Sequence, residues 1–136
     1  MIYRISSEKT IKDLNDAFGK AFPFLKVEVI ANARAHKPGV NRPIFCKHDL
    51  KLGTISKKLN GEVEFDIRPD LTVQDLERLF EEKYGLTVQV FRKSSGSWLE
   101  TTATDAWTLE KQNEFGNILN TRDEEEIDEF DNDATK

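Results

Sequence analysis

VEFDIRPDLTVQDLERLFEEKYGLTVQV, residues 63–90, contains in turn a strand, a helix and a second strand. Apolar residues alternate with polar ones in Val63–Ile67 and again in Leu86–Val90, which is the pattern of half-buried strands. Between these runs, apolar residues recur at helical spacing. Thr72 and Asp75 stand at the spacing of a capping box, so we expect the helix to begin just after Thr72.

A similar pattern occurs earlier in the chain. Residues 5–22 overlay residues 67–84 with an offset of 62 residues, which falls to 61 around Pro23, so that the similar units are residues 2–30 and 63–91. The identical pairs are Ile5/Ile67, Thr10/Thr72, Asp13/Asp75, Leu14/Leu76, Phe18/Phe80, Leu25/Leu86, Val27/Val88 and Val29/Val90. We expect the two helices to end at Pro23 and Gly85. This internal pseudo-repeat predicts that equivalent apolar residues are buried equally.

Two tandem strand–helix–strand units predict an α+β fold of the ferredoxin-like, split-βαβ type, with two helices on one face of a mainly antiparallel sheet. A β-grasp sheet is the alternative. The second unit continues through Phe91–Lys93 into a turn at Ser94–Ser97 and a return strand at Trp98–Thr102, which adds a C-terminal hairpin strand. A third helix, capped by Thr104 or Asp105, is expected to follow.

The length of 136 residues suits one domain with a buried core, to which nine Phe, two Trp and two Tyr contribute large side chains. We expect this single domain to span residues 1–120. Residues 121–136 are strongly acidic and contain few large apolar side chains, which predicts a disordered acidic tail. One Cys excludes an intrachain disulfide. No apolar run reaches membrane-spanning length and no secretory signal is visible, so we expect a cytoplasmic protein.

Charge is segregated along the chain. Residues 31–60 carry seven Lys or Arg and one Asp, whereas residues 61–121 and residues 122–136 each have a net charge of −6. Within the positive part, residues 33–60 have the Pro and Gly content of a long loop, which is a candidate binding surface. The candidate binding residues are Arg34, Lys37, Arg42, Lys57 and Lys58. They suit an anion, but the net charge of −5 and the lack of an aromatic platform argue against nucleic acid.

The sequence contains none of the common catalytic or phosphate-binding motifs. The only Cys and both His residues lie close together in sequence: His36, Cys46 and His48. Cys46 and His48 could form a Cys–His pair for nucleophilic catalysis, or all three could be soft metal ligands. One pair and an isolated His do not make the paired short-spaced motifs of a zinc site. We therefore assign no catalytic residue, cofactor or metal ligand, and keep a small enzyme or metal protein around Cys46 and His48 as an alternative.

The stretch Leu79–Lys93, followed by Trp98–Thr101 and Asp105–Glu110, resembles a family of small bacterial cytoplasmic proteins. The resemblance lies mainly within residues 79–110. It implies a bacterial cytoplasmic source. Because no activity is assigned to that family, it implies no catalytic or binding residue.

The leading functional prediction is a non-enzymatic module that binds another protein. Trp98 lies on the return arm of the hairpin, next to Arg92 and Lys93, and Trp is common among interface hot spots. A strand at the end of a sheet can recruit a partner strand through its unpaired backbone groups. Anion or nucleic-acid binding through residues 34–58 is the competing prediction. No membrane partner is expected, and the oligomeric state is left open.

Overall fold

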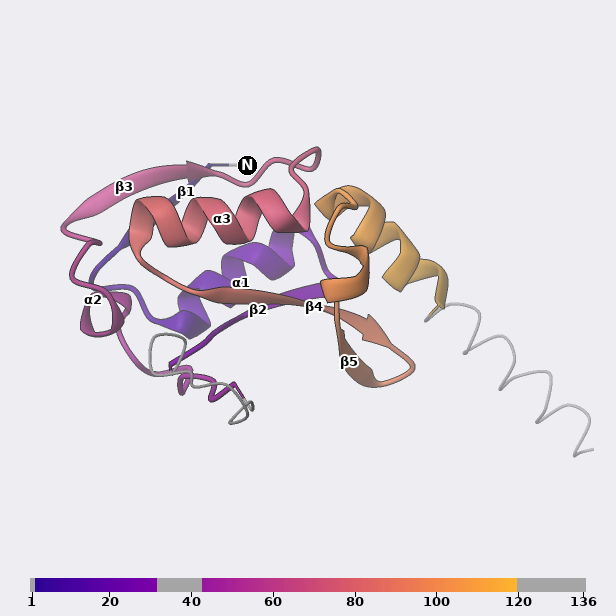
Figure 1. Cartoon of the computed structure of the whole chain (residues 1–136), viewed down its shortest axis with the longest axis horizontal. Helices are drawn as coiled ribbons and strands as arrows, with labels where there is room; N and C mark the ends of the chain where they lie inside the picture. The colour runs from indigo at the N-terminus through magenta and orange to yellow at the C-terminus, as the bar shows by residue number, and fades with distance from the viewer. Residues whose placement is uncertain (1, 32–42, 120–136) are drawn as a thin grey trace, which may run out of the picture.

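The computed structural model describes residues 2–31 and 43–119, and Figure 1 shows how their elements are arranged. The elements in chain order are β1 (Ile2–Ser6), α1 (Ile11–Ala21), β2 (Leu25–Val29), α2 (Leu52–Ile55), β3 (Glu62–Asp66), α3 (Val73–Tyr84), β4 (Val88–Ser94), β5 (Ser97–Glu100) and the 3-10 helix η1 (Thr102–Thr104). A further helix covers residues 109–119. The predicted α+β class is confirmed.

The strands form two antiparallel sheets, a pair β1–β3 and a trio β2–β4–β5. The expectation of one shared sheet was wrong. Hydrogen bonds join the first strands of the two units to each other, with Tyr3 opposite Phe65. The second strands are joined likewise, with Glu28 opposite Gln89. The sheets stand apart because helices lie between them: in Figure 1, α3 runs between β3 and β4, and its Phe80 packs edge-on against Phe65 at 5.1 Å between ring centres.

The core is built from equivalent positions of the two units. Phe18 and Phe80 are each 2 % exposed, so the predicted equal burial of these two rings is confirmed. The other equivalent pairs are buried as well, namely Ile5/Ile67, Ile11/Val73, Leu14/Leu76, Phe22/Tyr84, Leu25/Leu86, Val27/Val88 and Val29/Val90. Each helix therefore contributes one apolar face to a common core.

The helix boundaries follow the predicted capping residues. The Thr10 side chain accepts a hydrogen bond from the Asp13 amide, and the Asp13 carboxylate accepts one from the Thr10 amide. Thr72 accepts the corresponding bond from the Asp75 amide at the start of α3. Helix α3 ends at Gly85, whose φ of 63° is the left-handed conformation that glycine adopts without strain.

Backbone hydrogen bonds join α1 to α2 and α3 to helix 109–119 in the same way. In each pair, the first-turn amides of one helix donate to carbonyls just before the other helix. The first-turn amides of that second helix donate to carbonyls just before the first. The bonds of the first pair are Ile11 N–Leu50 O, Lys12 N–His48 O, Leu52 N–Lys9 O and Gly53 N–Ser7 O. Those of the second pair are Val73 N–Trp107 O, Gln74 N–Asp105 O, Leu109 N–Leu71 O and Glu110 N–Pro69 O.

This arrangement corrects the predicted start of the third helix. The helix begins at residue 109, whereas Thr104 lies in η1 and Asp105 stands four residues before that start, so neither residue caps the helix. Thr108 is the capping residue, because its side chain accepts a hydrogen bond from the Lys111 amide.

The described part of the predicted loop 33–60 contains more regular secondary structure than a loop would. Ile30 and Phe45 form a β-bridge, and α2 lies within the stretch. Residues 33–42 and the predicted tail 121–136 lie outside the described residues. Within the described ranges, no helix has the length and apolar character needed to cross a membrane.

Candidate protein-binding surface on the β2–β4–β5 sheet

The β4–β5 hairpin closes through a two-residue turn. Ser94 pairs with Ser97, and the residues between them, Ser95 and Gly96, have φ values of 50° and 80°. Two successive positive φ angles define a type I′ turn, whose twist matches that of the strands it joins. The turn thus fixes the register that places Trp98 opposite Lys93.

Strand β5 is at the edge of its sheet. In the described ranges, no strand or bridge pairs with its other edge. Trp98 is 38 % exposed and Leu99 is 46 % exposed, on opposite faces of the strand. An edge with unpaired backbone groups and large apolar side chains is a site at which another strand can add.

A cluster of rings and one ammonium group covers the side of this sheet that carries Trp98. The Lys26 Nζ lies 5.1 Å from the centre of the Trp98 ring and 5.2 Å from that of Phe91. The Phe45 ring meets Phe91 edge-on, with 5.6 Å between ring centres. We call Lys26, Phe45, Phe91 and Trp98 the aromatic cluster. Its cation–ring contacts hold Trp98 against the sheet while leaving part of it exposed.

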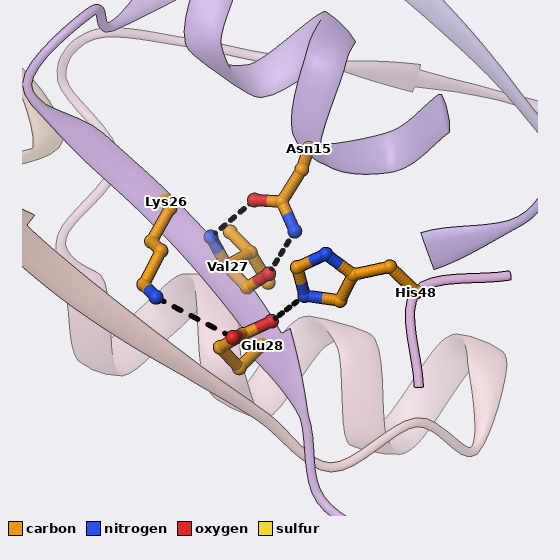
Figure 2. A network of polar contacts seen from close by, with 5 residues as sticks. All are labelled: Asn15, Lys26, Val27, Glu28 and His48. Carbon is orange, nitrogen blue, oxygen red and sulfur yellow. Dashed lines mark hydrogen bonds and ion pairs between the residues drawn. The ribbon is translucent and has the colours of Figure 1, made fainter. Parts of the chain in front are cut away.

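Next to the aromatic cluster, a polar network ties β2 to α1 and to the segment before α2 (Figure 2). Glu28 accepts hydrogen bonds from Lys26 at 3.4 Å and from His48 Nε2 at 2.5 Å. The Asn15 amide donates to the Val27 carbonyl and accepts from the Val27 amide, at 2.5 and 2.7 Å. The network positions Lys26 beneath Trp98. It contains no hydroxyl or thiol that a His–carboxylate pair would activate.

Arg92, a predicted binding residue, holds the C-terminal helix in place. Its guanidinium donates to the Gln112 side chain at 2.7 Å and lies 4.7 Å from the Phe115 ring. Gln112 is fully buried and donates in turn to the carbonyl and the hydroxyl of Thr104. Burial lowers the pKa of Arg92 from its ordinary value. Its contacts are therefore internal, and we do not place it on the binding surface.

Lys57 and Lys58 belong to the segment between α2 and β3, which lies at the end of the molecule away from the β4–β5 hairpin (Figure 1). They line an open hollow of about 370 Å³ together with Gly85 and Thr87. The Lys58 ammonium donates to the Glu82 carbonyl. The predicted residues Arg34, Lys37 and Arg42 lie outside the described residues. Of the predicted binding residues, the structure brings Lys93 together with Trp98, and Lys57 together with Lys58.

Cys46 is buried, and burial raises the pKa of its thiol. A reactive cysteine needs a lowered pKa and access to solvent, so Cys46 lacks the features of a nucleophile. In the described part of the chain, no three His, Cys, Asp or Glu side chains gather closely enough to hold a metal ion. The neighbouring His48 is engaged by Glu28.

Sequence patterns did not predict that Lys26, Phe45, Phe91 and Leu99 belong to this surface. The alternation along β2 carries a partial signal, because Lys26 and Glu28 must face away from the buried Val27. It does not show that Lys26 reaches Trp98, since that depends on how three separate strands align.

No family model matches the chain, and neither the curated proteins nor the solved structures contain a match. The resemblance of residues 79–110 to a small bacterial family stays a prediction.

Proposed function

We propose that this protein is a non-enzymatic protein-binding module, and that its partner adds an extended segment to the free edge of β5. The observation that carries the proposal is an edge strand whose Trp98 and Leu99 are both exposed. Main-chain hydrogen bonds would supply affinity, and side chains on the two faces of the strand would supply specificity.

The direction of the backbone groups supports this proposal. In a hairpin with a two-residue turn, Ser94 and Ser97 form a hydrogen-bonded pair, and such pairs then alternate along the strands. Leu99 and Thr101 accordingly face β4, and the Thr101 amide donates to the Val90 carbonyl at 3.4 Å. Trp98 and Glu100 therefore direct their N–H and C=O groups toward the free edge.

The side-chain contacts of the aromatic cluster also support the proposal. Lys26 lies within 5.1 Å of the Trp98 ring centre, and Glu28 holds that lysine in turn. A Trp already restricted by such contacts loses less conformational entropy when a partner packs on it. Less of the free energy of binding is then spent on ordering the Trp98 side chain.

The experiment is affinity capture from the native cell with two matched variants. Trp98→Ala and Val63→Ala each remove a side chain that is 38 % exposed, but Val63 lies on β3 in the other sheet. We expect Trp98→Ala to reduce the captured partner at least tenfold, because hot-spot Trp residues contribute about 2 kcal/mol or more. Val63→Ala should leave capture unchanged. Equal capture by both variants would remove β5 as the site.

Anion binding is the second candidate, and the hollow beside Lys57 and Lys58 is the observation that favours it. The matching experiment measures binding of a labelled single-stranded oligonucleotide between about 50 and 200 mM salt. A steep salt dependence that is lost in Lys57→Ala/Lys58→Ala would support this candidate. Binding that is absent at low salt would eliminate it.

A further inference from the structure

We infer that the strand added to β5 is β5 of a second copy of this chain, so that two three-stranded sheets join into one six-stranded sheet. The inference rests on the proposed function, because it names the partner of the same edge. It follows from three properties of β5: the direction of its backbone groups, the alternation of its side chains and the position of its charge.

The faces of the strand restrict the possible registers. A two-fold axis perpendicular to the joined sheet keeps the aromatic cluster of both copies on one side. Residues opposite each other must then point to the same face, so Trp98, Leu99 or Glu100 can each lie opposite its own copy. The Glu100 register is excluded because it places two carboxylates opposite each other, which leaves the registers of Leu99 and Trp98. Registers that place Trp98 opposite Leu99 are excluded.

Backbone hydrogen bonding selects between the two allowed registers. With Leu99 opposite Leu99, Trp98 of each copy stands opposite Glu100 of the other. Because both residues direct N–H and C=O groups to the free edge, this register makes four hydrogen bonds. With Trp98 opposite Trp98, Glu100 stands opposite Gly96 in the turn, and β5 makes only the two bonds between the Trp98 residues. The first register is the one that satisfies the whole edge.

The side chains of the first register are complementary. The two Leu99 residues, each 46 % exposed in the single chain, meet at the axis as a close, non-hydrogen-bonded pair. Glu100 of each copy stands beside Trp98 of the other, whose ring carries Lys26 and whose neighbour on β4 is Lys93. Glu100 has no ion pair with any residue of ranges 2–31 and 43–119. Pairing thus places the Glu100 carboxylate beside two lysine side chains, of which Lys26 already pairs with Glu28, and it places no like charges opposite each other.

The expected dimer is weak. Two four-residue strands bury less surface than the roughly 1,200–2,000 Å² of stable complexes. We therefore expect self-association at concentrations of roughly 10 to 500 μM, measured by sedimentation equilibrium of the full chain. The mass should rise from 15.6 kDa toward twice that value and no further.

The first test removes an edge hydrogen-bond donor while leaving the hairpin intact. Glu100→Pro deletes the amide that faces the free edge, a position where proline is tolerated in an edge strand. Glu100→Ala is the matched control, since it removes the same side chain and keeps the amide. Two of the four hydrogen bonds are lost in the proline variant, so its dissociation constant should exceed that of the control by about 30-fold. Equal constants would overturn the inference.

The second test reads the register. In a Cys46→Ala background, Leu99→Cys should form an intermolecular disulfide on oxidation, because the two residues face each other at the axis. Trp98→Cys and the exposed helix variant Glu81→Cys should not. A disulfide formed only by Trp98→Cys would overturn the proposed register.

The outcomes separate this inference from the proposed function. A chain that remains at 15.6 kDa at about 1 mM overturns the inference. If Glu100→Pro nevertheless reduces capture of a different protein, the proposed function survives that result. If Glu100→Pro changes neither measurement, both fail. Masses above that of a dimer would overturn the closed two-fold pairing, because they require a second, different edge.

Discussion

Gly85 is the residue at which a single added methyl group has the clearest consequence. Its φ of 63° is unfavourable for other residues, and a Cβ there would lie 2.5 Å from the Ser56 hydroxyl oxygen. That hydroxyl donates to the Tyr84 carbonyl, so it is not free to move away. We expect Gly85→Ala to lower the free energy of unfolding by about 1–3 kcal/mol in urea titrations, without a change in the slope.

Gly19 provides the matched comparison. It lies inside α1, and nothing comes within 4 Å of the position a Cβ would take. Gly19→Ala should raise the free energy of unfolding by about 0.5–1 kcal/mol, because alanine has the higher helix propensity. Destabilisation by both substitutions would contradict the distinction between the two sites.

Glu77 is the residue that should make stability depend on pH near neutrality. Burial, followed by the charge of Asp105, raises the pKa of Glu77 from 4.5 to about 7. The folded protein therefore holds this proton more tightly than the unfolded chain, so stability falls as pH rises from 4.5 to 7. The effect is complete above pH 7 and absent below pH 4.5.

The variant Glu77→Gln removes this titration. Because the side chain is part-exposed, solvent screens the penalty, and we expect Glu77→Gln to stabilise the protein by about 1–2 kcal/mol at pH 8. At pH 4 the two proteins should unfold alike. Thermal unfolding of both across this range is the measurement, and a difference that is independent of pH would refute the assignment.

At the scale of elements, α1 and α3 should be equally important to the core. Phe18 and Phe80 occupy equivalent positions, are each 2 % exposed, and lie in ring clusters with Phe22 and Phe65 respectively. Replacing either with Ala should cost about 3–5 kcal/mol of unfolding free energy, through lost burial and the cavity left behind. The exposed Ile2→Ala is the control. Near-neutral effects of both Phe substitutions would contradict the shared core.

The elements that could be predicted are those with a local signal. Helix α3 combines apolar spacing with Thr72 at one end and Gly85 at the other, and all three signals lie within fourteen residues. Helix α2 has only four residues and no side-chain cap, so it has no periodicity to detect. Helix 109–119 was recognised but its start was misplaced, because its first-turn amides at Leu109 and Glu110 bind carbonyls before α3, which is remote in sequence.

At the scale of the whole molecule, the missing information is how separate elements align. Both units gave the same pattern of strand, helix and strand, which is compatible with one sheet or two. The division into two sheets depends on side chains such as Phe65 and Phe80, which meet only in the folded protein. The candidate surface could also be predicted only in part. Trp98 was identified from its hairpin, whereas its contact with Lys26 crosses the sheet and depends on how the strands align.

The reciprocal bonds between helix starts also bear on how the chain folds. Thr10 meets Lys51, and Thr72 meets Thr108, so each helix pair closes a loop of about forty residues before its first-turn amides are satisfied. A four-residue helix such as α2 has no stability in isolation. We therefore expect α2 to form only when its loop closes. In native-state hydrogen exchange, the amides of Leu52 and Gly53 should then be released together with those of Ile11 and Lys12, as one cooperative unit.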